Sequence, residues 1–315
     1  MNLPSLAELE AAAAIVYRHM PPTPQYRWPL LAERLGADVW LKHENHTPVG
    51  AFKLRGGLVY FQGLEQVRGV AAATRGNHGQ SIAYCARQYL VPATIVVPHG
   101  NSVEKNAAMR SLGARLIEHG HDFQAAKEHA ESLARAERLH MVPSFDRRLV
   151  LGVASASLEL LRAVPDLEVL YVPIGLGSGI CAAIAVREAL GLRTEIIGVV
   201  SAHARAYAAS FAERRPVELP AATRLADGMA VRTPDPGALE LIWRHVERVV
   251  EVTDDEVARA IALIFECTHN CAEGAGAAPV AAIAKERGRL AGRKVAAVLS
   301  GGNIDRDMFA QAIGS

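Results

Sequence analysis

The sequence predicts an α/β protein in which helices cover mostly parallel sheets. Short apolar runs alternate with longer amphipathic stretches, and such alternation of strands and helices implies parallel sheets covered on both faces. Two of the apolar runs end in glycine-containing turns that lead into a helix. The 315 residues, half of them hydrophobic, suffice for one large domain or for two lobes with ample core.

The N-terminal part begins with an amphipathic helix expected over Leu6–Met20. A short strand over Val39–Leu41 then leads through a loop into a helix that begins near Ala51, with Lys53 in its first turn. A cation beside the positive end of a helix dipole is electrostatically unfavourable. We therefore expect a depressed pKa for Lys53 and an amine that is easier to use as a nucleophile. The alternative is an ordinary surface lysine on a helix.

The first alternating block contains a turn suited to an anion. Strands are expected at Val70–Thr74, Ala93–Val97, Arg115–Glu118 and Met141–Val142, and helices at Asn77–Tyr89, Ser102–Leu112 and Asp122–Leu139. The turn over 74–80 joins the first strand to the first helix, so the N-terminal amides of that helix point at whatever lies in the turn. A carboxylate is one anion that such a site suits.

The second alternating block contains a glycine loop after a strand. Strands are expected at Val169–Ile174, Glu195–Val200, Val249–Val252 and Lys294–Leu299. Helices are expected at Leu149–Ala163, at Ala275–Arg287, and from a capping box that begins at Thr253 as far as Cys267. Residues Glu213–Pro236 are expected to form a loop. The glycines at 175, 177 and 179 let the backbone wrap a phosphate at a helix start. A dinucleotide fingerprint is the alternative, but Ile180 replaces its third small residue and the next strand ends without an acid.

Composition excludes several classes of function. The 34 basic and 33 acidic residues nearly cancel, so nothing indicates a nucleic acid or another polyanion as partner. The four cysteines lie in apolar helical patterns without a Cys-x-x-Cys pair. The apolar runs are too short to span a membrane, and Glu8 and Glu10 interrupt the only candidate signal segment. We expect a soluble cytoplasmic protein.

At Lys53, in the 74–80 turn and in the 175–179 loop, the sequence resembles the pyridoxal-phosphate enzymes of fold type II (tryptophan synthase β-like), and most of all the serine/threonine dehydratase and serine racemase family. The resemblance runs from about Pro22 to Asp305. Each glycine loop alone is weakly specific, whereas the combination is specific. The resemblance implies two lobes, each with a mostly parallel sheet covered by helices: a large cofactor-binding domain over 1–68 and 147–315 and a small mobile domain over 69–146. It also implies pyridoxal 5'-phosphate as cofactor and a homodimer.

The resemblance assigns roles residue by residue. Lys53 is similar to the family's Schiff-base lysine, Asn77 to the asparagine that binds the cofactor's 3'-oxygen, and Ser300 to the hydroxyl that faces the pyridine nitrogen. Ala51 replaces a serine of the lysine motif. The other implied cofactor contacts are Phe52, Gly175, Leu176, Gly177, Ser178, Gly179, Gly228 and Glu273. For Glu273, a solvated carboxylate at a helix start is an equally weighted alternative. The implied substrate contacts, around the substrate carboxylate, are Thr74, Gly76 and His78.

Two departures from the family pattern bear on function. Racemases of the group have a serine where this chain has Arg75, and a guanidinium is a poor proton shuttle at neutral pH, so racemisation is disfavoured. Arg75 either points to solvent or clamps an anionic group, and we include it among the candidate substrate contacts. The metal-dependent members have acids where this chain has Val200 and Ala206, which lack the oxygen ligands of a hard cation. We therefore expect no divalent-metal site.

The expected activity is that of a pyridoxal-phosphate-dependent dehydratase. It would convert a β-hydroxy-α-amino acid, L-threonine or L-serine, into a 2-oxo acid and ammonia. The hydroxyl expected at Ser300 does not hold the pyridine nitrogen protonated, and this favours β-elimination over transamination. The alternatives are a dehydratase of a bulkier or acidic 3-hydroxy amino acid (phenylserine, 3-hydroxyaspartate), a serine racemase-like enzyme, and an idle cofactor-binding homologue.

Overall fold

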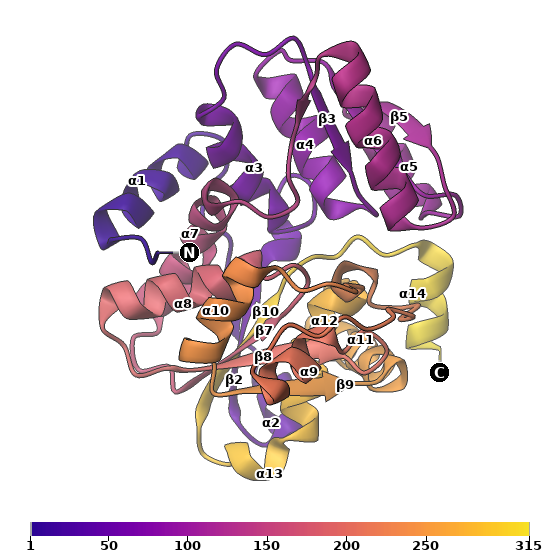
Figure 1. The fold of residues 1–315 in the computed structure, drawn as a ribbon. Helices are drawn as coiled ribbons and strands as arrows, with labels where there is room; N and C mark the ends of the chain where they lie inside the picture. The colour runs from indigo at the N-terminus through magenta and orange to yellow at the C-terminus, as the bar shows by residue number, and fades with distance from the viewer. Residues whose placement is uncertain (1, 315) are drawn as a thin grey trace.

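A computed structural model describes residues 2–314 of the chain. Its strands form two separate sheets that are surrounded by helices. The six-stranded sheet and its helices form the lower part of the view in Figure 1, and the four-stranded sheet and its helices form the upper part. The six-stranded sheet has the order β1-β2-β10-β7-β8-β9, and the four-stranded sheet has the order β5-β4-β3-β6. The predicted α/β class with two mostly parallel sheets is confirmed.

The six-stranded sheet combines strands from both ends of the chain. Its strands are β1 (Gln25–Arg27), β2 (Asp38–His43), β7 (Val169–Pro173), β8 (Glu195–Ser201), β9 (Arg248–Val252) and β10 (Lys294–Leu299). Every neighbouring pair is parallel except β1 and β2, which are antiparallel. In the register of β10 against β2, Lys294 pairs with Asp38 and Leu299 with His43. The carboxyl ends of β2, β10 and β7 therefore meet at one edge of the sheet.

Helices cover both faces of this sheet, because successive side chains of a strand point to opposite faces. On β7, Leu170 and Val172 pack with α1 (Leu6–Tyr17), α7 (Arg147–Ala163), α8 (Ser178–Leu190), α9 (Ala206–Glu213) and α10 (Pro236–His245). Val169 and Tyr171 pack on the other face with α2 (Pro29–Leu35), α11 (Asp254–Thr268), α12 (Gly274–Lys285), α13 (Arg287–Leu290) and α14 (Arg306–Ile313).

The four-stranded sheet is entirely parallel and rich in alanine. It consists of β3 (Val70–Ala73), β4 (Ala93–Val97), β5 (Arg115–Glu118) and β6 (His140–Met141), with α4 (Asn77–Gln88), α5 (Val103–Ser111) and α6 (Phe123–Glu137) as the intervening helices. One face packs on α6 through Ala126 and Ala130. The other face shares a hydrophobic core with α1, α4 and α3 (Lys53–Gln62). Because α1 also packs on the six-stranded sheet, this core links the two sheets.

The predicted elements agree with the structure except at their ends and in short segments. The first helix ends at Tyr17 rather than Met20, and the helix expected from Ala51 begins at Lys53. The sequence did not predict β1, α2, α9, α10, α13 and α14. The expected loop over Glu213–Pro236 holds only the short 3-10 helix η2 (Asp227–Met229) before α10 begins. Within residues 2–314, no helix combines the length and apolar character needed to cross a bilayer.

Candidate active site

Three predicted site segments meet because their strands are neighbours in the six-stranded sheet. Lys53 follows β2, Ser300 follows β10, and the 175–179 loop follows β7. The backbone joins the first two segments directly, since the Phe52 N–H donates to the Ser300 carbonyl oxygen at 2.9 Å and Ala51 pairs with Gly301. Ligands of open α/β sheets bind at the carboxyl ends of strands, where these segments lie.

The Lys53 amine is enclosed and faces the glycine loop. Its Nζ donates to Ser178 Oγ at 3.1 Å and lies 5.1 Å from the centre of the Phe52 ring. Burial lowers the pKa of Lys53 to about 8, because an ammonium loses its hydration there. The predicted depression of the pKa is therefore confirmed, but its cause is loss of water rather than the helix dipole. The alternative of an ordinary surface lysine is excluded.

The 175–179 loop forms a backbone cradle at the start of α8. Gly177 has a φ of 103°, and a Cβ there would lie 2.6 Å from Ala238 Cβ. A Cβ on Gly175 would lie 2.5 Å from the carbonyl oxygen of Gly228, so the 228 segment packs directly on the loop. No side chain caps α8, whose first N–H groups are available to an anion. The cradle thus presents amide donors next to the Lys53 amine.

The 74–80 turn is tied together by one hydroxyl. Thr74 Oγ1 accepts from the N–H groups of Gly76 at 3.0 Å and Gly79 at 3.3 Å. His78 is buried, and burial together with the Lys53 charge lowers its pKa to about 3, so the imidazole is neutral. Its Nε2 has no hydrogen-bond partner among the described residues, which leaves a buried polar atom for a ligand. Arg75 is exposed and makes no hydrogen bond or ion pair with any described residue.

Asn77 is held from two sides. Its Nδ2 donates to Glu273 Oε1 at 2.6 Å, and its Oδ1 accepts from Asn303 Nδ2 at 2.8 Å. Glu273 is only 3% exposed, so the alternative of a solvated carboxylate is wrong. Burial, with the nearby charge of Asp227, raises the pKa of Glu273 to about 7, while Lys105 opposes the rise.

Three residues of this site were missed by the sequence analysis. Asn303 lies three places after Ser300 and could have been noticed there. Asp227 immediately precedes Gly228 and makes an ion pair of 2.7 Å with Lys105. Lys105 carries no signal in the sequence, because it reaches the site from α5, which belongs to the other sheet.

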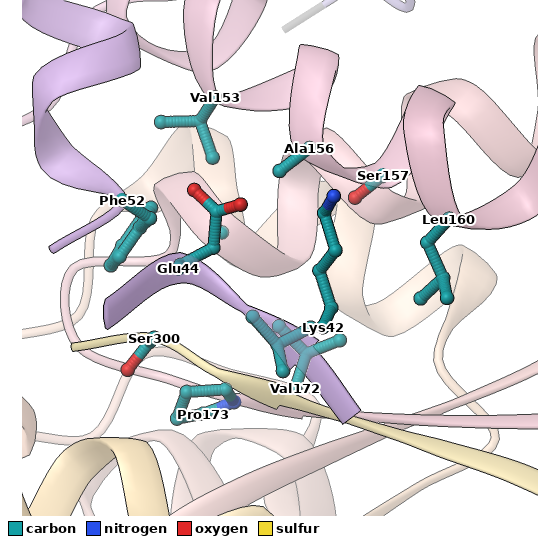
Figure 2. A pocket seen from close by; sticks show the side chains of 12 residues that line it. Lys42, Glu44, Phe52, Val153, Ala156, Ser157, Leu160, Val172, Pro173 and Ser300 are labelled. Carbon is teal, nitrogen blue, oxygen red and sulfur yellow. The ribbon is translucent and has the colours of Figure 1, made fainter. Parts of the chain in front are cut away.

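A small cavity lies behind the site (Figure 2). It measures about 20 Å³, enough for about one water molecule, and Phe52, Gly179 and Ser300 form part of its wall. Lys42 and Glu44 point from the β2 segment toward α7, while Ser300 lies beside Pro173 at the other end. Both charged groups belong to a buried network that includes Arg55, two residues after Lys53.

The donor set suits a phosphate-bearing aldehyde better than a metal ion. An amide cradle, a low-pKa amine, an unpartnered imidazole nitrogen and neutral amide and hydroxyl side chains surround one region. Within residues 2–314, no three histidine, cysteine or acidic side chains are arranged to hold a metal ion. The side chains of Val200 and Ala206 are apolar and buried.

Comparisons with known proteins agree with this chemistry. Residues 16–301 match the family described as pyridoxal-phosphate dependent enzyme. The L-threonine ammonia-lyase of Thermotoga maritima is 35% identical over 289 residues, which cover 90% of this chain and 72% of that protein. The processed form of threonine deaminase isoform 2 from Solanum lycopersicum superimposes with a TM-score of 0.90 at 26% identity, over 99% of this chain and 94% of that one. Maize serine racemase has a TM-score of 0.92 at 22% identity over 99% of this chain and 98% of that one, which shows a shared fold. The chain belongs to the family of pyridoxal-phosphate dependent enzymes.

Proposed function

We propose that this enzyme is an ammonia-lyase that dehydrates a β-hydroxy-α-amino acid, with L-threonine or L-serine as substrate. The observation that carries the proposal is the enclosed Lys53 amine, with a pKa of about 8, facing the cradle at Ser178. An amine of this pKa is partly unprotonated near neutral pH and can act as nucleophile and base. The relative in Thermotoga maritima is named as an L-threonine ammonia-lyase, which supports the same class of reaction.

The residues around Lys53 would hold the cofactor. The 175–179 loop and the start of α8 would bind the phosphate, Asn77 and Ser300 would contact the ring, and Phe52, Gly228 and Glu273 would line the site. When bound, pyridoxal phosphate supplies an electron sink for the carbon next to the substrate carboxylate. The Ser300 hydroxyl would not hold the pyridine nitrogen protonated, so expulsion of a β-substituent would be favoured over transamination.

Different groups of the chain would then bind the substrate and move its protons. The 74–78 turn, whose amides start α4, would bind the substrate carboxylate, and the neutral His78 would lie beside it. The Lys53 amine would remove the Cα proton as general base, oriented by its hydrogen bond to Ser178. The β-hydroxyl would leave as water, which balances the proton removed from Cα, and a second water molecule would release ammonia and the 2-oxo acid.

An acidic substrate is the second candidate, and Arg75 is the observation that favours it. This guanidinium is exposed beside the carboxylate turn and has no partner among the described residues. It would pair with the second carboxylate of 3-hydroxyaspartate. Lys105 is not available for this purpose, because Asp227 and Glu273 already surround its ammonium. Racemisation remains disfavoured, because Arg75 cannot shuttle protons near neutral pH.

A substrate panel tests the proposal. The protein purified with pyridoxal phosphate is incubated with L-threonine, L-serine, phenylserine and 3-hydroxyaspartate, and 2-oxo acid is measured with a coupled dehydrogenase. We expect release from L-threonine or L-serine, and none with Lys53→Ala under the same conditions. If no hydroxy amino acid yields a 2-oxo acid, the proposal fails. A preference for 3-hydroxyaspartate would select the second candidate.

Domain organisation, assembly and location are parts of the same proposal. Residues 1–68 and 147–315 would form the large domain, and 69–146 the small mobile domain. The assembly would be a homodimer in the cytoplasm, with a small amino acid as substrate and no nucleic-acid or membrane partner. Sedimentation equilibrium tests the dimer, and a mass equal to one chain would contradict it.

A further inference from the structure

Lys105 connects the two sheets at the candidate active site. It lies on α5, in the upper part of Figure 1, but its ammonium ends among residues of the lower part. The Nζ atom is 2.7 Å from Asp227 Oδ2 and 3.5 Å from Glu273 Oε2. Lys105 is only 6% exposed, so this contact is largely removed from water. A buried lysine shared by two carboxylates from the opposite part is a specific arrangement.

The stem of Lys105 lies against the 74–78 turn. A Cβ on Gly76 would lie 2.5 Å from Lys105 Cδ, so a larger residue at position 76 would displace the lysine. The far carboxylate oxygen of Glu273, Oε2, has no hydrogen-bond partner among the described residues, and its ion pair with Lys105 is its polar contact. The near oxygen, Oε1, accepts from Asn77. Lys105 therefore acts on Asn77 through Glu273.

We propose that Lys105 is a positioning residue of this site: it binds both Asp227 and Glu273, favours the carboxylate form of Glu273 that accepts from Asn77, and holds α5 against the site. The proposal builds on the dehydratase function, because it assigns the groups that set the orientation of Asn77. It gives Lys105 and Asp227 opposite effects on Glu273. Lys105 stabilises the carboxylate, whereas Asp227 repels it.

The charged groups that face Glu273 determine in which direction each variant shifts its pKa. They are Lys105 from α5 and Asp227 from η2, and Asn77 from α4 adds a neutral donor. The pKa of Glu273 is about 7, so its carboxylate gains a proton as the pH falls through neutrality. Loss of the ammonium raises this pKa further, and loss of the Asp227 charge lowers it. Variants at the two positions therefore shift the acidic limb of activity in opposite directions.

The test uses Lys105→Met and Asp227→Asn in the enzyme loaded with pyridoxal phosphate. The carboxyl carbon of Glu273 is titrated by carbon-13 NMR with labelled glutamate, and Glu273→Gln assigns the signal. In parallel, kcat/KM for L-threonine is measured against pH. We expect Lys105→Met to raise the Glu273 pKa and the acidic limb by about one to three pH units, because an opposite charge nearby shifts a carboxyl by that much. We expect Asp227→Asn to lower both.

A matched control removes another contact between α5 and the lower part of Figure 1, which contains the six-stranded sheet. Ser102, the cap of α5, donates a hydrogen bond to Asp305, and Asp305→Ala breaks it without touching Lys105. This variant is expected to leave the Glu273 pKa and the acidic limb unchanged. Equal shifts in Asp305→Ala and Lys105→Met would overturn the proposal, as would shifts of the same sign in Lys105→Met and Asp227→Asn. If the parent enzyme releases no 2-oxo acid, the dehydratase function fails, and the NMR titration still decides the role of Lys105.

Discussion

Replacing Arg55 with methionine is expected to destabilise the folded protein strongly, because this guanidinium holds a buried charge network together. Its nitrogens donate to Glu44 at 2.6 and 2.9 Å, to Glu159 at 2.6 and 2.9 Å, and to Ser155 at 2.9 Å. Arg55 and Glu44 are completely buried. Lys42 forms a second ion pair with Glu159, so two cations balance two carboxylates.

The magnitude follows from the charge that Arg55→Met leaves behind. With only Lys42 remaining, one of two enclosed carboxylates loses its counter-ion, and breaking a buried pair in this way costs about 3–5 kcal/mol of unfolding free energy. For a chain of this length, at roughly 2 °C per kcal/mol, Tm falls by about 6–10 °C. The same change disturbs the first turn of α3, which carries Lys53, so turnover falls too.

The stability difference between the parent and Arg55→Met is also expected to depend on pH. Burial raises the pKa of Glu44, but Arg55, together with Lys42 and Thr23, outweighs this effect and the net pKa is lowered. A carboxyl with a lowered folded pKa stabilises the fold above its unfolded pKa of about 4.3, and this stabilisation disappears as the pH falls through the folded value. The advantage of the parent over Arg55→Met is therefore complete at neutral pH and shrinks in acid.

Thermal and urea unfolding followed by circular dichroism measure the effect. Arg115→Met is the matched control, because it removes an exposed ion pair of 3.0 Å with Glu137 and changes stability by less than about 1 kcal/mol. Equal stability of Arg55→Met and Arg115→Met would refute the reasoning. So would a difference between parent and Arg55→Met that grows as the pH falls.

Four further predictions concern the site. Lys53→Ala is expected to lower turnover by several orders of magnitude and to abolish the visible absorbance of bound cofactor. Retained colour and activity in the variant would contradict the role of Lys53. Gly175→Ala places a Cβ 2.5 Å from the Gly228 carbonyl oxygen and is expected to weaken cofactor affinity by at least about tenfold, as measured by fluorescence titration. Gly288→Ala, with open space around its Cβ, is the control and is expected to leave the affinity unchanged. Arg75→Ser is expected to leave kcat/KM for L-threonine unchanged. If 3-hydroxyaspartate is a substrate, the variant is expected to lower kcat/KM for it by about tenfold or more, since a charge-assisted contact contributes about 1.5–3 kcal/mol. A loss with L-threonine would show that Arg75 serves every substrate. A chelator is expected to leave activity and Tm unchanged, and a loss restored by magnesium would reveal a metal site that Val200 and Ala206 do not supply.

Local features of the sequence predicted those site segments that end a strand or start a helix. Lys53, the 74–80 turn and the 175–179 loop each combine an apolar run with glycine or asparagine, and this pattern depends on neighbours along the chain. Their convergence depends on the strand order β2-β10-β7, which the periodicity does not specify. The resemblance to a known family supplied that information.

The burial and the partners of individual charged side chains could not be predicted from neighbouring residues in the sequence. Glu273 begins a helix and so had a solvated alternative, but packing of the 301 segment buries it: a Cβ on Gly301 would lie 2.5 Å from its Oε1. Lys53 has the expected lowered pKa for a different reason, because enclosure depends on residues far away in the sequence. Lys105 reaches the site only through the packing of α5 across the two sheets, and no motif marks it.

The pairing of β2 with β10 also constrains how the protein is made. β2 is synthesised before its partner β10 and Ser300, which follow only after more than two hundred intervening residues. At about 5–20 residues per second, β2 waits for roughly tens of seconds with one edge unpaired. During translation the nascent chain exposes this unpaired strand edge to chaperones and to other nascent chains. Termination a few residues before Ser300 would yield a product that keeps Lys53 but lacks the backbone hydrogen bond between Phe52 and Ser300.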